Sequence, residues 1–264
     1  MSIDTIVCGE FSATCDSVDD HSVDMIMVDM PYEVTESVWD VLIPFNLMWE
    51  KYNRIIKPHG AMVFTGCQPF TAMLICSNLK MYRHEWIWDK SLKTGHLEAK
   101  RRPMMIHESV IVFSQKEVNY YPQMNPRKPR NIYAGVDKSA VYKGKRPEGL
   151  NVDGAGYPST ILDFPAPRVL WGKGERLHPN QKPVDLFAYL IRTYTQAGDL
   201  VFDPVCGSGT TAVAAQQEDR HFICADNDAG YVAIANERLR NSDPFQDTTL
   251  KPGVVQKSLW SGTS

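Results

Sequence analysis

A strand, a glycine turn, a helix and a second strand follow one another in residues 199–226, the segment that most constrains the fold. The apolar residues 200–202 predict a short buried strand, and residues 221–225 predict a second one that ends at Asp226. Between them, Gly207 and Gly209 allow a tight turn that brings backbone N–H groups close to a ligand. A carboxylate after the second strand can accept hydrogen bonds from the hydroxyls of a ribose. The segment therefore predicts a nucleotide-binding unit of an α/β fold.

The other strands of this unit must come from earlier in the chain. Only one expected helix, residues 229–240, and a polar tail follow Asp226, whereas a doubly wound sheet needs more than two strands. The sequence therefore predicts a permuted order in which the nucleotide-binding half comes last. Residues 207–212 also match the dinucleotide pattern G-x-G-x-x-A, which leaves an NAD-dependent oxidoreductase as an alternative, although this order is unusual for a dehydrogenase.

A second polar segment follows another apolar run. Residues 25–28 are continuously apolar, as in a buried parallel strand, and they stop at Asp29-Met30-Pro31-Tyr32. Open α/β sheets bind ligands at the carboxyl ends of their strands, so we expect both polar segments at one edge. Residues 57–60, Lys-Pro-His-Gly, are expected to end a helix. The remaining expected elements are strands at residues 3–8, 61–64, 85–88 and 109–114, and helices at residues 45–56 and 69–77 and after Pro183.

Length and composition fit one α/β domain with an insertion, or at most two domains, because the chain has 264 residues of which 43% are hydrophobic. No apolar run is long enough to span a bilayer, so no membrane partner is expected. The six cysteines are scattered without a C-x-x-C pair, which predicts reduced thiols and a cytoplasmic location. The seven histidines lack the spacing of metal ligands, so no metal is expected.

Positive charge is concentrated in the middle of the chain. Residues 80–146 contain 15 Lys and Arg against 6 Asp and Glu, whereas the whole chain carries a net charge of −3. Residues 115–173 also lack any sustained period, which predicts a loop-rich insertion that either binds a polyanion or is a solvated surface. The cations expected to neutralise phosphates are Lys100, Arg101, Arg102, Arg127, Lys128, Arg130, Lys143, Lys145 and Arg146.

With both segments in view, the chain resembles the amino-group DNA methyltransferases of the permuted β group. Residues 29–32 resemble the D-P-P-Y catalytic motif, and residues 203–211, Asp-Pro-Val-Cys-Gly-Ser-Gly-Thr-Thr, resemble D-P-F-x-G-S-G-T-T. Residues 178–183, His-Pro-Asn-Gln-Lys-Pro, are similar to H-P-T-Q-K-P. The motifs stand in the family's order and span most of residues 3–240. Three departures are Met30 in place of the first Pro, Glu10 where a Gly-Asp pair is common, and Asp226 in place of Glu.

The resemblance implies a Rossmann-like, S-adenosylmethionine (SAM)-dependent methyltransferase fold of the α/β class. Such a fold has a mostly parallel, circularly permuted sheet with helices on both faces and a loop-rich insertion. Its expected parts are a catalytic half (residues 1–114), a basic target-recognition insertion (115–173), a SAM-binding half (174–240) and a polar tail (241–264). The implied cofactor contacts are Glu10, Lys182, Asp203, Pro204, Cys206, Gly207, Ser208, Gly209, Thr210 and Asp226. Competing roles are a helix cap for Asp226 and a solvated helix start for Lys182.

The resemblance also implies the chemistry. Asp29 and the Met30 carbonyl would accept the N–H groups of an exocyclic amine, Pro31 would restrict Met30, and Tyr32 would stack on a flipped base. The implied partner is double-stranded DNA, with a possible homodimer. Asp at position 29 favours adenine N6, because cytosine-N4 relatives more often carry Ser there.

Three other substrates or activities stay open: cytosine N4, a DNA-binding protein with a degenerate motif, and methylation of protein or RNA. Cytosine C5 methylation is disfavoured, because it uses a cysteine nucleophile that usually follows a proline, and none of the six cysteines does.

Overall fold

The computed structural model describes residues 2–30, 43–126, 155–166 and 181–241. The chain divides into two compact units, one of residues 1–121 and 160–249 and the other of residues 122–159 and 250–264. The described part of the second unit contains an antiparallel pair of two-residue strands, β6 (Asn125–Pro126) and β7 (Ala155–Gly156). Everything that follows concerns the first unit. The division into a catalytic half, an insertion, a SAM-binding half and a tail stays a prediction.

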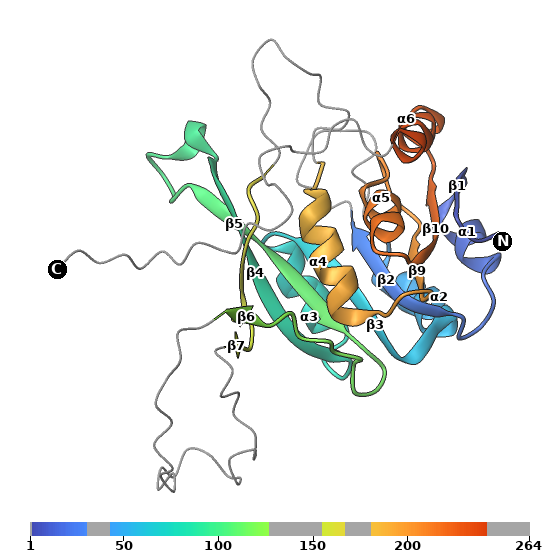
Figure 1. The fold of residues 1–264 in the computed structure, drawn as a ribbon. Helices are drawn as coiled ribbons and strands as arrows, with labels where there is room; N and C mark the ends of the chain where they lie inside the picture. Colours follow the sequence, from blue (N-terminus) through green and yellow to red (C-terminus); the bar gives the residue numbers. More distant parts are fainter. Residues whose placement is uncertain (1, 31–42, 127–154, 167–180, 242–264) are drawn as a thin grey trace, which may run out of the picture. The chain divides into compact units, whose positions relative to one another are not determined.

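A sheet of eight described strands forms the centre of the first unit, in the order β1-β10-β9-β2-β3-β5-β4-β8 (Figure 1). Five neighbouring pairs are parallel, and β5 is antiparallel to both β3 and β4. The mostly parallel sheet agrees with the predicted fold class. The strands are β1 (Thr5–Cys8), β2 (Val23–Asp29), β3 (Ile56–Gly66), β4 (Tyr82–Thr94), β5 (Met105–Phe113), β8 (Ile161–Asp163), β9 (Leu200–Asp203) and β10 (His221–Asp226).

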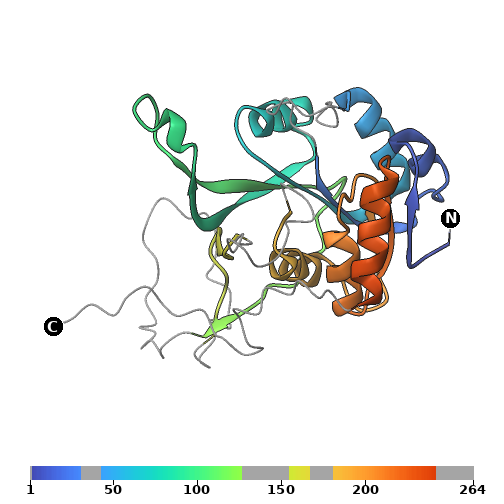
Figure 2. The ribbon, with the colours of Figure 1, turned by 90° about the horizontal axis from the view of Figure 1, so that it is seen from above.

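Helices cover both faces of this sheet (Figure 2). One face packs against α4 (Val184–Tyr194), α5 (Thr210–Gln217) and α6 (Ala229–Arg240). The other packs against α1 (Phe11–Asp16), α2 (Phe45–Ile55) and α3 (Phe70–Ser77). None of the helices in the described ranges is long and apolar enough to cross a membrane.

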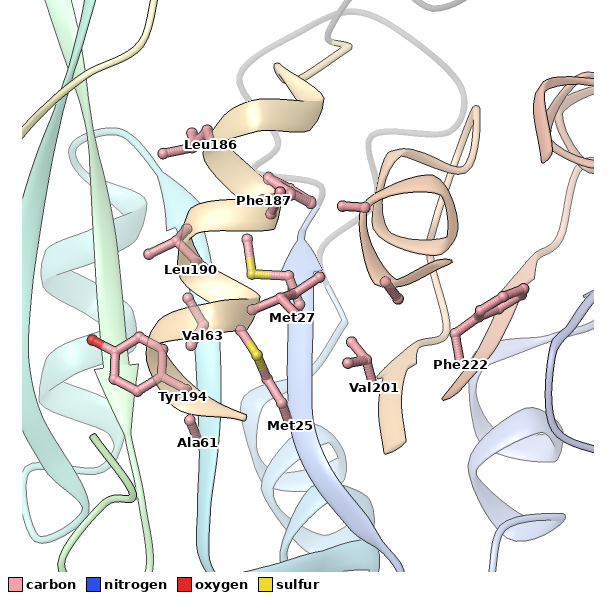
Figure 3. Packing of buried hydrophobic residues seen from close by; sticks show 14 of the residues in the cluster. Met25, Met27, Ala61, Val63, Leu186, Phe187, Leu190, Tyr194, Val201 and Phe222 are labelled. Atoms are coloured by element: carbon pink, nitrogen blue, oxygen red, sulfur yellow. The ribbon is translucent and has the colours of Figure 1, made fainter. Parts of the chain in front are cut away.

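The residues of β2 alternate between two hydrophobic cores. Met25 and Met27 pack with α4 and α5, whereas Ile26 and Val28 pack with α1 and α2, and all four are fully buried. Figure 3 shows the first of these cores, in which Met25 and Met27 lie opposite the α4 side chains Leu190 and Tyr194. Each such side chain contributes about 1.5–3 kcal/mol on burial. Burial on both faces explains why the strand is an unbroken apolar run.

The permuted order is confirmed by the pairing of β2 with β9. Ile26 is in register with Phe202, and the two strands run parallel, so the N-terminal and C-terminal parts of the chain share one sheet. From β9 the chain proceeds through α5 to β10 on one side, and from β2 it proceeds through α2 to β3 on the other. The β2–β9 boundary is therefore the point at which the strand order reverses, where open α/β sheets bind their ligands.

Two stretches contain strand that was not predicted from the sequence. The helix α2 ends at Ile55, as expected from residues 57–60, but these residues lie within β3, where the register shifts between the pairs Val23–Ile56 and Met25–Ala61. An irregularity in the strand therefore accommodates Pro58 and Gly60. β8 lies within the segment predicted to be loop-rich, and it extends the sheet by pairing with β4. A strand of three residues is too short to show a period.

Gly209 provides a test of how the glycine turn packs. It has a φ of +82°, and a Cβ atom there would lie 2.7 Å from Cβ of Ala235 in α6. Gly198 has a φ of +85° but no atom within 4 Å of such a Cβ. We expect Gly198→Ala to lower the free energy of unfolding by about 1–2 kcal/mol from backbone strain alone. Gly209→Ala should lower it by roughly 1–3 kcal/mol more through overpacking.

Urea unfolding of both variants measures the difference. Equal losses at the two glycines would contradict the close approach of α5 and α6 at this turn.

Candidate active site

Carboxylates lie at or just beyond the carboxyl ends of four adjacent parallel strands. Asp29 ends β2, Asp203 ends β9, Asp226 ends β10, and Glu10 follows β1 by two residues. Because these strands are neighbours in the order β1-β10-β9-β2, the two polar segments predicted from the sequence meet at one edge of the sheet. This edge is the candidate site. In the described residues, no group of three or more His, Cys, Asp or Glu is placed to hold a metal ion.

The Asp226 carboxylate holds the glycine turn. It accepts hydrogen bonds from the backbone N–H of Gly207 at 2.8 Å and of Asp228 at 3.0 Å, and it stays partly exposed. The N–H of Gly207, expected to face a ligand, is therefore occupied by Asp226. The cap of α6 is Asp228, which accepts from Gly230 and Tyr231, so the competing capping role for Asp226 is wrong.

Asp203 supports the turn from beneath. Its buried carboxylate accepts hydrogen bonds from the Thr211 hydroxyl at 2.5 Å and from the Val205 N–H at 3.1 Å. Burial raises the pKa of Asp203 to about 7, and the charges of Asp226 and Asp29 add to this, although the two hydrogen bonds act against it. Asp203 thus shapes the turn and faces the protein interior.

Most of the other predicted cofactor contacts are buried as well. This holds for Pro204, Cys206, Ser208, Gly209 and Thr210, whereas Gly207 is partly exposed and Glu10 is exposed. Sequence analysis missed Arg238, a buried residue of α6 that donates to the Ser208 carbonyl at 2.6 Å and to its hydroxyl at 3.0 Å. An arginine in the last turn of a helix ordinarily indicates a solvated end, so the sequence carried no signal for this role.

Asp29 is held by two donors from distant parts of the chain. Its Oδ1 accepts a hydrogen bond from the Thr65 hydroxyl at 2.5 Å, and its Oδ2 lies 2.8 Å from Nζ of Lys182. Thr65 belongs to β3, in register with Asp29, and Lys182 precedes α4 by two residues. The Lys182 side chain is 7% exposed and that of Asp29 is 25% exposed. The competing role of Lys182 as a solvated helix start is therefore wrong.

Two further charged residues extend this group. Glu108 of β5 places Oε2 3.3 Å from Nζ of Lys182 and Oε1 3.1 Å from Nζ of Lys90 in β4. Burial alone would lower the pKa of Lys182, but Asp29 and Glu108 outweigh it and hold that pKa above its ordinary value. For Glu108, burial alone would raise the pKa, yet Lys182 and Lys90 keep it below its usual range. Both groups are therefore charged at neutral pH.

The other predicted catalytic and DNA-binding residues are only partly within the described ranges. The Met30 side chain is buried in the core beneath α2 and α3, and Pro31 and Tyr32 lie outside the described residues. Lys100, Arg101 and Arg102 are exposed at the end of the β4–β5 hairpin, beyond the short 3₁₀ helix η1 (His96–Glu98), and Arg102 pairs with Glu98 (Figure 1). The six cations predicted between Arg127 and Arg146 also lie outside the described residues.

Comparison with known proteins identifies the family. A family model of N6/N4 type, described as DNA methylase, matches residues 23–237. The chain belongs to this family of DNA methyltransferases. It is 30% identical to the type II methyltransferase M1.MboII of Moraxella bovis over 245 residues, which cover 84% of this chain and 90% of that one. It is 26% identical to the DNA adenine methyltransferase YhdJ of Escherichia coli K12, with 89% and 82% covered.

Solved structures of methyltransferases have the same fold. The M1.HpyAVI–SAM complex superposes with a TM-score of 0.59 at 22% identity, covering 89% of this chain and 98% of that one. The cytosine-N4-specific PvuII methyltransferase gives 0.65 at 17% identity, with 92% of each chain covered. The predicted family and the Rossmann-like fold class are thus confirmed. Membership excludes the NAD-dependent oxidoreductase that the glycine pattern alone left open.

The raised pKa of Asp203 makes the stability of this methyltransferase depend on pH. A free Asp titrates near 3.9, so between about pH 4 and pH 7 the folded state keeps a proton that the unfolded state has released. Stability therefore falls as the pH rises through this window, by up to about 4 kcal/mol from this one group. Asp203→Asn removes the titrating carboxyl. We expect the decrease between pH 5 and pH 8 to be smaller in this variant than in the wild type.

Urea unfolding at both pH values gives the two decreases. For each protein the change in the free energy of unfolding between pH 5 and pH 8 is compared, not its absolute value. The Asn amide cannot accept both hydrogen bonds, so the variant is less stable than the wild type at every pH. An identical pH dependence in both proteins would contradict the assigned pKa.

Proposed function

We propose that this methyltransferase transfers the methyl group of SAM to the N6 amine of an adenine flipped out of duplex DNA. The observation that carries the proposal is the Asp29 carboxylate, partly exposed at the strand reversal point and fixed by Thr65 and Lys182. An aspartate at this motif position favours adenine over cytosine N4. The adenine methyltransferase YhdJ is among the relatives that cover most of this chain.

The chain's own residues fit SAM. The carboxylates of Asp226 and Glu10 stand at the ends of β10 and β1, where hydroxyl and amine groups of a nucleoside can donate to them. The turn at Gly207 and Gly209, supported by Asp203 and Arg238, provides the backbone surface beside them. When bound, SAM supplies an electrophilic methyl group on a sulfonium.

Asp29 would orient the attacking amine. A carboxylate accepts several hydrogen bonds, and the contacts with Thr65 and Lys182 fix the orientation in which Asp29 would accept one from an amine N–H. The Met30 carbonyl would accept the second N–H, which draws the nitrogen towards tetrahedral geometry and directs its lone pair at the methyl group. Lys182 is not the base, since its raised pKa keeps it protonated. The methylated amine would lose its proton to water, and Tyr32 would stack on the flipped base.

The base specificity is tested by incubating unmethylated genomic DNA with the protein and radiolabelled SAM, followed by nucleoside analysis. We expect the label in N6-methyladenine. Label in N4-methylcytosine alone would overturn the adenine assignment, and SAM binding without transfer to any duplex would favour the degenerate DNA-binding protein.

The variant Asp29→Ala tests the role of the carboxylate. It should reduce methyl transfer by about 100- to 1,000-fold, the usual effect of removing one fixed polar group from an active site. SAM binding, measured by calorimetry, should persist.

The exposed cations at the end of the β4–β5 hairpin are proposed to contact phosphates. The logarithm of the affinity falls with the logarithm of the salt concentration, and each phosphate contact makes this slope steeper by about 0.9. We expect the triple change of Lys100, Arg101 and Arg102 to Ala to reduce this slope by roughly 2–3 in a fluorescence anisotropy titration. Lys80 and Lys116, exposed beyond the other end of the same hairpin, provide a control pair whose change to Ala should leave the slope unchanged. Equal slopes for the triple variant and the wild type would contradict the contact.

A further inference from the structure

We propose that Glu108 is a positioning residue for methyl transfer, which acts on the acceptor Asp29 through Lys182. The inference rests on the proposed function, because it assigns a role towards the amine acceptor of that same site. Glu108 would not touch the substrate. Its carboxylate is shared between two lysines and has no direct contact with Asp29 among the interactions described above.

Four charges alternate along one path through the site. The path runs from Asp29 to Lys182 at 2.8 Å, from Lys182 to Glu108 at 3.3 Å, and from Glu108 to Lys90 at 3.1 Å. Two carboxylates and two ammonium groups sum to zero. The side chains of Lys182, Lys90 and Glu108 are only 7%, 10% and 17% exposed, whereas Asp29 is 25% exposed at the open end of the path. The substrate therefore meets only the last member of the group.

The two carboxylates compete for one ammonium group. Lys182 lies between Asp29 and Glu108, so the pull of Glu108 limits how closely and in which direction the ammonium approaches Asp29. Without Glu108, the attraction of the Lys182 ammonium towards β5 is lost, and the ammonium would move towards Asp29. A tighter ion pair would use more of the Asp29 lone-pair density and rotate the carboxylate away from its Thr65 hydrogen bond. An amine would then meet a weaker and misaligned acceptor.

A purely structural ion pair would have a different signature. Burying charged groups is costly, and a balanced pair can often be replaced without loss of stability, whereas removing one partner leaves an uncompensated charge. Loss of Glu108 leaves a net charge of +1 in the group, and loss of Lys90 as well restores neutrality. Stability and catalysis can therefore be separated, because the double change repairs the charge balance but leaves Lys182 without its second carboxylate.

The experiment compares Glu108→Gln, the double variant Glu108→Gln with Lys90→Met, and the control Glu218→Gln. Glu218 pairs with Arg192 and is 16% exposed, close to the value for Glu108, but it lies at the C-terminal end of α5, away from the site. For each full-length variant, kcat and the KM values for SAM and DNA are measured on unmethylated DNA, together with the thermal midpoint.

We expect Glu108→Gln to lower kcat by about 10- to 100-fold, the scale of a small misplacement in an active site, with both KM values within about twofold of wild type. In the double variant the thermal midpoint should return towards wild type while kcat stays low. The control should keep the wild-type kcat.

An unchanged kcat in Glu108→Gln would overturn the proposal, and so would recovery of kcat together with stability in the double variant. If Glu108→Gln fails to fold, the double variant is measured alone: a low kcat supports the proposal, and a wild-type kcat overturns it. Failure of the proposed function is distinct, since the wild type itself would then methylate no DNA.

Discussion

The parallel pairing of β2 with β9 is the interaction on which the rest of the molecule depends. It joins two segments about 175 residues apart and places Asp29 and Asp203 at the ends of adjacent strands. Both strands are buried on both faces, so the helices of both layers hold the pair in place. The pairing of β2 with β9 therefore brings the glycine turn after β9 close to Asp29 and its partner Lys182.

Around the boundary, the polar groups fall into two supporting systems. Beneath the glycine turn, Asp203 and Arg238 bind backbone and hydroxyl groups and leave Asp226 partly exposed. At Asp29, Thr65 donates to Oδ1 and Lys182 contacts Oδ2. Asp29 is held by two buried side chains and Asp226 by two backbone N–H groups, so the geometry of both carboxylates is fixed before a ligand arrives.

Sequence alone predicted a mostly parallel sheet and the edge that carries the site, because continuous apolar runs such as residues 25–28 and the polar residues that end them are local signals. The permuted order followed from the position of the glycine turn in the chain. The ion-pair path was out of reach for a physical reason. Lys182, Glu108 and Lys90 are ordinary surface residue types, and their burial arises only when β4, β5 and the start of α4 converge. Arg238 was missed for the same reason, and β8 because three residues show no alternation. Glu108 lies two residues before the apolar run 110–113, the one local hint available.

The long stretch of chain between β2 and β9 has a consequence during synthesis. Ribosomes add roughly 5–20 residues per second, so β2 leaves the ribosome on the order of 10–35 s before its partner strand exists. Throughout that interval one edge of β2 is unpaired, and the face of β2 that carries Met25 and Met27, later covered by α4, is exposed to solvent. Unpaired strand edges and exposed apolar side chains are the features that lead nascent chains to aggregate or to bind chaperones. Asp29 and the glycine turn can therefore come together only after β9 has been synthesised and has paired with β2.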